Sequence, residues 1–247
     1  MASFERQMLG YSRIAYLGES ILAEYMRDSG GELLLFVDES STDTQGFVAR
    51  TSARKIIVAF RGTELLSTRD HAIDLDVTLV PDLVSGGNVH RGFLRATESI
   101  MGNVLRAIEP HSDMPIMVVG HSLGGALATL VAHRLSHANE LVEQVHTFGS
   151  PRVGDALFAA AYNRDLRHVT TRHQNCCDIV SMIPSVLQGY RHVGQLRYYD
   201  ALGHANDHST WLYRAWDSLS ARAIHWGRLP TRGIADHSLN AYMSCLD

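Results

Sequence analysis

Residues 116–125 read IMVVGHSLGG, an apolar run that leads into a Gly-x-Ser-x-Gly pattern centred on Ser122. The apolar run is typical of a strand buried on both faces of a sheet. A helix is expected directly afterwards, because apolar side chains recur with helical spacing at Leu123, Leu127, Leu130, Val131 and Leu135. A serine between a buried strand and a helix matches the nucleophile elbow, a strained turn that lifts the hydroxyl above the sheet edge. We therefore predict that Ser122 is a catalytic nucleophile.

Buried strands and amphipathic helices alternate along the rest of the chain. One or two helices, broken near Gly18, are expected in residues 4–26, and further helices in residues 97–108 and 239–246. Strands are expected at 33–37 and 46–50, as a hairpin, and at 56–60, 73–79, 145–148, 169–172 and 193–199. This alternation predicts the α/β class, a mainly parallel sheet with helices on both faces. No repeat or linker divides the chain, so we expect a single domain over residues 1–247.

The composition is that of an ordinary globular protein. The 247 residues are 45% hydrophobic and carry a formal net charge of −4, which excludes a disordered chain. Neither half has the basic excess of a nucleic-acid-binding protein, so no nucleic-acid partner is predicted. No apolar run approaches the roughly 18 residues of a transmembrane helix, so no membrane-spanning segment is predicted.

The cysteines and the N-terminus bear on the cellular location. Cys176 and Cys177 are adjacent and Cys245 is far away, so the chain has no disulfide framework. We interpret the adjacent pair as a packing feature rather than a redox or metal site. The first residues, MASFER, contain no hydrophobic signal core. We expect a cytoplasmic protein for the sequence as given, and a secreted one if a signal peptide has been removed.

A serine hydroxyl becomes a good nucleophile when a histidine removes its proton and a carboxylate orients that histidine. An acid and then a histidine are therefore expected after Ser122. Asp178 follows the strand expected at 169–172, where strand ends deliver site residues in open α/β sheets. Its rivals are Asp200, Asp207 and Asp217. His237 lies just before the last helix, whose start disfavours a protonated imidazole and so favours a base.

A pair of histidines suggests an alternative metal site. His204 and His208 have the spacing of two metal ligands on one helix face. The segment contains Gly203 and Asn206, lacks helical periodicity and offers no third ligand nearby. We therefore predict no metal at this segment.

Six short motifs follow one another along the chain. They are IVAFRGT at 57–63, VHRGF at 89–93, GHSLGG at 120–125, TFGSPRVG at 147–154, DIV at 178–180 with Pro184, and Asp236, His237 and Tyr242 near the end. Together they resemble the class 3 lipases, the fungal-type triacylglycerol lipase family of α/β-hydrolases, which also includes feruloyl esterases. The resemblance covers about residues 55–200 and 236–246.

The resemblance implies an α/β-hydrolase fold and an ester hydrolase that needs no metal or organic cofactor. It implies that Ser122 is the nucleophile, Asp178 the acid and His237 the base. It also implies an oxyanion hole made by Thr63 and the backbone N–H of Leu123. The implied substrates are small-molecule or lipid esters, acylglycerols above all, cleaved through an acyl-serine intermediate during transient contact with a lipid surface.

The family's lid corresponds to about residues 64–72, where Leu65 and Leu66 are the only large apolar residues. His71 stands where the family usually has a tryptophan, which argues against strong interfacial activation. Residues 201–231 match no part of the family pattern.

Other functions use the same residues. A carboxylesterase or feruloyl-type esterase would act on short or aromatic acyl esters, and peptide or thioester cleavage needs the same triad. A non-catalytic binding protein with a hydrolase fold is a further alternative. The full set of nucleophile, acid, base and oxyanion residue argues against it, because a silent scaffold has no physical need for all four.

Overall fold

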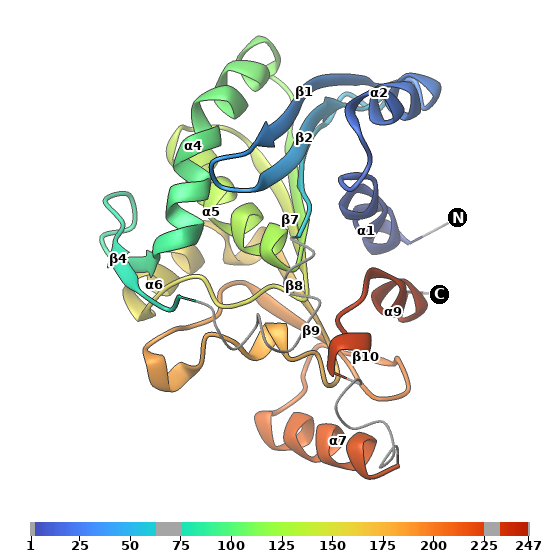
Figure 1. Cartoon of the computed structure of the whole chain (residues 1–247), viewed down its shortest axis with the longest axis vertical. Coiled ribbons are helices and arrows are strands. Elements are labelled where there is room, and N and C mark those ends of the chain that lie inside the picture. Colours follow the sequence, from blue (N-terminus) through green and yellow to red (C-terminus); the bar gives the residue numbers. More distant parts are fainter. Residues whose placement is uncertain (1–2, 63–75, 225–232, 247) are drawn as a thin grey trace.

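The computed structural model describes residues 3–62, 76–224 and 233–246. In this part of the chain, an eight-stranded sheet crosses the molecule in the order β1-β2-β3-β6-β7-β8-β9-β10 (Figure 1). Neighbouring strands from β3 to β9 are parallel, and antiparallel strands complete both edges. The strands are β1 (Glu32–Glu39), β2 (Thr44–Arg50), β3 (Ile56–Phe60), β6 (Ile116–His121), β7 (Val142–Phe148), β8 (Thr170–Asn175), β9 (Gln195–Tyr199) and β10 (Ala205–Asn206).

Helices cover both faces of this sheet (Figure 1). One apolar core lies beneath α1 (Phe4–Ile14), α2 (Glu19–Asp28) and α9 (Leu239–Ser244). The other lies beneath α4 (Arg91–Ile108), α5 (Leu123–His137) and α6 (Ala156–Leu166). A further helix, α7 (Trp211–Ile224), packs on the adjacent cysteines through Ala221.

The central strands supply residues to both cores. Every residue of β3 and β6 is buried, as expected of strands covered on both faces. Val58 and Val118 belong to one core, whereas Ile57 and Val119 belong to the other, because successive side chains of a strand point in opposite directions. Since both cores lie against the same sheet, we propose that residues 1–247 form one domain.

Most of the predicted elements are confirmed, including the α/β class with its mainly parallel sheet. The strand predicted at 73–79 is wrong in its described part, because residues 76–78 are not in a strand. The carbonyl groups of Val77 and Thr78 instead accept hydrogen bonds from the hydroxyl of Tyr190 and the N–H of Arg91. The nearest strand is β4 (Leu79–Pro81), which begins at the last residue of the predicted segment and pairs with β5 (Asn88–His90). Residues 73–75 lie outside the described residues.

Helices α6 and α7 were not anticipated by the periodicity. The sequence of α6 is ALFAAAYNRDL, in which alanines occupy both faces of the helix, so large apolar residues show no clear helical spacing. Its start is marked instead by Asp155, whose carboxylate accepts a hydrogen bond from the Phe158 N–H at 2.9 Å.

No helix in the described ranges is long and apolar enough to cross a membrane.

Two glycines allow α5 to begin directly above the ends of β3 and β6. A Cβ atom on Gly120 would lie 2.0 Å from the carbonyl oxygen of Gly124. A Cβ atom on Gly124 would lie 2.3 Å from the carbonyl oxygen of Phe60. Since these neighbours are backbone atoms, no side-chain rotation can make room, and the contact fixes Ser122 at the carboxyl edge of the sheet.

We expect Gly124→Ala to lower the free energy of unfolding by about 3 kcal/mol or more, because the added methyl must displace backbone. Gly102→Ala is the matched control. Gly102 lies in the interior of α4 and is exposed, and its added Cβ would meet only Arg106 Nη1 at 3.9 Å. This change should raise stability by about 0.5–1 kcal/mol. Urea unfolding followed by circular dichroism measures both, and a Gly124→Ala protein as stable as the parent would contradict the packing described.

Candidate active site

Ser122 occupies the sharp turn between β6 and α5. Its backbone has φ 58° and ψ −128°, a conformation that residues other than glycine rarely adopt. The turn is held in place because the Ser122 N–H donates to the carbonyl of Phe148 at 2.9 Å. The side chain of Ser122 therefore leaves the sheet at its carboxyl edge, although the residue as a whole is only 2% exposed.

The three residues predicted as nucleophile, acid and base lie together. The Nε2 atom of His237 is 2.8 Å from the Oγ atom of Ser122. The Nδ1 atom of His237 is 3.0 Å from each carboxylate oxygen of Asp178. These are hydrogen-bond distances at both nitrogens of one imidazole, between residues separated by 59 and 115 positions in the chain. The arrangement can move a proton between the hydroxyl and the imidazole.

The Asp178 carboxylate is fully buried and is held by several donors. Its Oδ1 atom accepts from the Val180 N–H at 2.9 Å, and its Oδ2 atom accepts from the Tyr242 hydroxyl at 2.7 Å. Burial raises the pKa of Tyr242 well above its usual value, so this hydroxyl stays protonated as a donor. A carboxylate satisfied in this way requires a proton on Nδ1 of His237. The lone pair of Nε2 then faces Ser122.

The rival carboxylates have other partners. Asp207 pairs with Arg197 through two contacts of 2.9 Å. Asp217 accepts from the hydroxyl of Tyr198 at 2.8 Å. Asp200 accepts from two backbone N–H groups of its own turn, at 2.9 and 3.0 Å. Over the residues that the structure describes, none of the three bonds to the predicted base.

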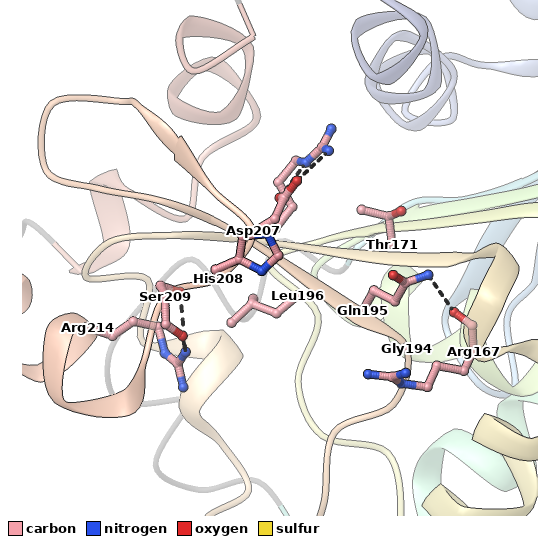
Figure 2. Close-up of a pocket in the computed structure, with 10 residues that line it drawn as sticks. Arg167, Thr171, Gly194, Gln195, Leu196, Asp207, His208, Ser209 and Arg214 are labelled. Carbon is pink, nitrogen blue, oxygen red and sulfur yellow. Dashed lines mark hydrogen bonds and ion pairs between the residues drawn. The ribbon is translucent and has the colours of Figure 1, made fainter.

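His204 and His208 do not gather a set of ligands. The Nδ1 atom of His204 is 3.5 Å from Asp200, and His208 lines a polar hollow beside Asp207 (Figure 2). That hollow lies at the amino ends of β8 and β9, the sheet edge opposite Ser122. Neither histidine belongs to a cluster of three metal-ligating side chains within the described ranges.

The adjacent cysteines are buried, and neither forms a disulfide bond. The sulfur atoms of Cys176 and Cys177 are 3.3 Å apart, and Cys176 donates to Asp217 at 3.3 Å. The hydrogen bond with Cys177 and burial both raise the pKa of the Cys176 thiol. A protonated, packed thiol agrees with the structural interpretation given above.

A second chain of hydrogen bonds connects the loop at Gly62 to the loop at His237. The Gly62 N–H donates to the Tyr16 hydroxyl at 3.0 Å, and that hydroxyl lies 3.1 Å from Nδ1 of His121. The Nε2 atom of His121 is 2.7 Å from the carbonyl oxygen of His237. Burial and the neighbouring His237 lower the pKa of His121 to about 3. A neutral His121 accepts from Tyr16 at Nδ1 and donates to the carbonyl of His237 at Nε2, so every member of the chain is satisfied.

The sequence does not predict this series of hydrogen bonds. His121 is the variable residue inside the Gly-x-Ser-x-Gly pattern, and its signal was a polar residue at the end of a fully buried strand. Tyr16 lies more than a hundred residues away, between α1 and α2, and no local pattern relates the two.

The predicted oxyanion hole is described in part. Leu123 is the first residue of α5, and a helix leaves its first N–H groups without an intrahelical partner. The backbone at Gly62 approaches the nucleophile closely, because a Cβ atom there would lie 2.8 Å from Cβ of Ser122. Thr63 and the predicted lid at about 64–72 lie outside the described residues.

Comparison with known proteins gives consistent matches. The family model for lipase (class 3) matches residues 57–188. The secreted mono- and diacylglycerol lipase 1 of Fusarium solani is 33% identical over 159 residues, covering 62% of this chain and 46% of that protein. A lipase of Rhizomucor miehei is 36% identical over 165 residues, covering 62% and 44%. The chain thus spans less than half the length of these curated relatives.

Solved structures agree in fold. The triacylglyceride lipase of Rhizomucor miehei superposes with a TM-score of 0.67 at 28% identity, covering 81% of this chain and 82% of that one. A structure described as "A serine protease triad forms the catalytic centre of a triacylglycerol lipase" gives 0.68 at 26% identity, covering 81% and 82%. These neighbours support the α/β-hydrolase fold.

Tyr16→Phe should lower kcat for a p-nitrophenyl ester about tenfold and leave KM unchanged, because it frees His121 and the loop of His237 without touching a bound ester. Tyr25→Phe is the matched control, since Tyr25 is 49% exposed on α2. Equal kcat values for the two variants would show that the hydrogen-bond chain does not position the base.

Proposed function

Because the chain belongs to the class 3 lipase family, we propose that it hydrolyses carboxylic esters of lipids, acylglycerols above all, through an acyl-Ser122 intermediate. One observation carries this proposal: Ser122, on a strained elbow, His237 and Asp178 form an unbroken series of hydrogen bonds of 2.8 and 3.0 Å. The order nucleophile, acid, base along the chain is that of α/β-hydrolases.

In the acylation half of the proposed reaction, His237 takes the Ser122 proton while Oγ attacks the ester carbonyl carbon. The carbonyl π electrons move onto the oxygen and form a tetrahedral oxyanion. This oxyanion collapses, the bond to the alcohol oxygen breaks, and His237 returns its proton to the departing alcohol. The products of this half are the acyl-serine and a free alcohol.

In deacylation, water takes the place of the alcohol. His237 removes a proton from water, the hydroxide attacks the acyl carbon, and the second tetrahedral intermediate releases Ser122 with the proton from His237. Asp178 accepts a hydrogen bond from Nδ1 of His237 and stabilises the imidazolium that forms in each half. We assign the oxyanion hole to the Leu123 N–H and to Thr63, and removing one such donor typically costs about 10²- to 10³-fold in rate.

The names of the relatives support lipid esters as substrates, since mono- and diacylglycerol lipases are among them. Exposed apolar side chains on α7 support contact with a lipid surface. Trp211, Leu212, Trp216 and Leu219 on this helix are between 61% and 69% exposed. Tryptophan and leucine on one surface helix are typical of a segment that rests at a membrane interface.

The relative from Fusarium solani is named as secreted, which supports the secreted location. The cytoplasmic location stays a prediction. The esterase alternative rests on the segment at 64–72, whose few apolar residues argue against strong interfacial activation.

We expect Ser122→Ala to lower turnover of p-nitrophenyl esters by about 10⁴-fold or more, because no other group can carry the acyl chain. Ser20→Ala, an exposed serine at the start of α2, is the matched control and should retain full activity. Circular dichroism checks that both variants fold. Turnover retained in Ser122→Ala would refute the assignment of the nucleophile.

The same assay on esters from C2 to C18 distinguishes the substrate classes. A maximum at medium or long chains, with release of fatty acid from an acylglycerol emulsion, supports the lipase proposal. A maximum at C2 to C4 with no increase above the micellar concentration would replace it with a carboxylesterase.

A further inference from the structure

Three metal-ligating side chains converge at the end of α5 remote from Ser122. His133 and His137 lie one turn apart on α5, and Asp165 faces them from α6. One candidate ligand atom from each residue lies within 4.8 Å of the others. The Nε2 atom of His137 is 3.7 Å from Oδ2 of Asp165, which is too long for a hydrogen bond.

The unusual member of this cluster is His133, which is fully buried. Its ring lies among the rings of Phe158, Tyr162 and His137, with centroid distances of 5.6, 5.8 and 4.6 Å. Neither ring nitrogen has a hydrogen-bond partner among the described residues. Nearly all buried polar atoms have such a partner, so an imidazole with neither nitrogen bonded leaves a nitrogen available to a ligand.

The polar neighbours of His133 already have partners. The hydroxyl of Tyr162 is bonded to Oγ1 of Thr170 at 2.9 Å. The carboxylate of Asp82 is paired with Arg134. The hydrogen bonds of these two groups are therefore directed elsewhere, and neither group is bonded to the imidazole of His133.

The ligand set suits a borderline transition metal. Histidines separated by four positions present their rings to a single ion on one helix face, and a carboxylate completes a set of three. In a tetrahedral zinc site, bonds of about 2.0–2.1 Å place ligand atoms about 3.4 Å apart, close to the separation of His137 and Asp165. Arg164 holds both oxygens of Asp165, at 2.8 and 2.9 Å, which orients the carboxylate.

We propose that His133, His137 and Asp165 bind a divalent transition-metal ion, Zn²⁺ by the chemistry of the set, and that the ion links α5 to α6. The side chains of His137 and Asp165 are 37% and 26% exposed, which provides an entry path and room for a water molecule as fourth ligand. Because α5 carries the nucleophile elbow at its opposite end, the ion stabilises the fold and takes no part in ester cleavage.

A second cluster, Cys176, Cys177 and Asp236, has the composition of a metal site but a different environment. Its thiols already contact Asp217 and Ser218. This cluster is the alternative zinc site that the titration described next must exclude.

Zinc titration of the full, chelator-treated chain tests the proposal. Calorimetry should detect one Zn²⁺ per chain whose Kd rises at least tenfold in His137→Ala and in Asp165→Asn. At a Zn²⁺ concentration about a hundredfold above the Kd, the Tm of the parent should rise by about 5 °C or more, and that of these variants should not. Both changes are at partly exposed positions, so folding is retained. His168→Ala, which removes an exposed histidine close to α6, is the matched control and should bind as the parent does.

Three results would overturn the proposal. They are a parent Kd no lower than that of His137→Ala, a loss of binding in His168→Ala equal to that in His137→Ala, and binding that is lost only in Cys177→Ser. The last result would assign the ion to the cysteines.

Discussion

The buried carboxylate of Asp178 is the constraint on which the rest of the site depends. A carboxylate without solvent contact is stable only when donors surround it, and here three donors come from two separate parts of the chain. Tyr242 and His237 lie at the C-terminal end, and Val180 lies in the loop after β8. Satisfying this one carboxylate therefore docks α9 on the sheet and fixes the imidazole that faces Ser122.

The two loops that flank the nucleophile are also connected to each other. The Tyr16 hydroxyl accepts a hydrogen bond from the Gly62 N–H, and Nε2 of His121 is hydrogen-bonded to the carbonyl of His237. The N-terminal helices thus contribute to the active site through hydrogen bonds, in addition to burying one face of the sheet. These hydrogen bonds connect the elbow at Ser122, the loop at His237 and the loop at Gly62 into one structural unit. This unit explains how a strained backbone at Ser122 can persist.

Local patterns predicted much of this site, and tertiary contacts supplied the rest. The elbow could be predicted because a buried strand, Ser122 and a helical stripe are contiguous. Asp178 and His237 could be predicted because chain order and the strand edge restrict where they lie. Tyr16 could not, since its partner His121 is close only in the fold. The histidine pair at 204 and 208, for which the sequence predicts no metal, lies outside any helix in the structure. His133 and His137 have the same spacing on α5, but His133 is hidden in an apolar stripe that reads as core.

The central claim is that His237 activates Ser122, and covalent trapping tests it most directly. The chain would be incubated with a p-nitrophenyl alkylphosphonate, and the modified residue would be located by peptide mass spectrometry. The account predicts one phosphonyl group per chain, on the Ser122 oxygen, and a labelling rate at least about 10³-fold lower in His237→Ala. Labelling of a different residue, or an equal rate in the variant, would contradict it.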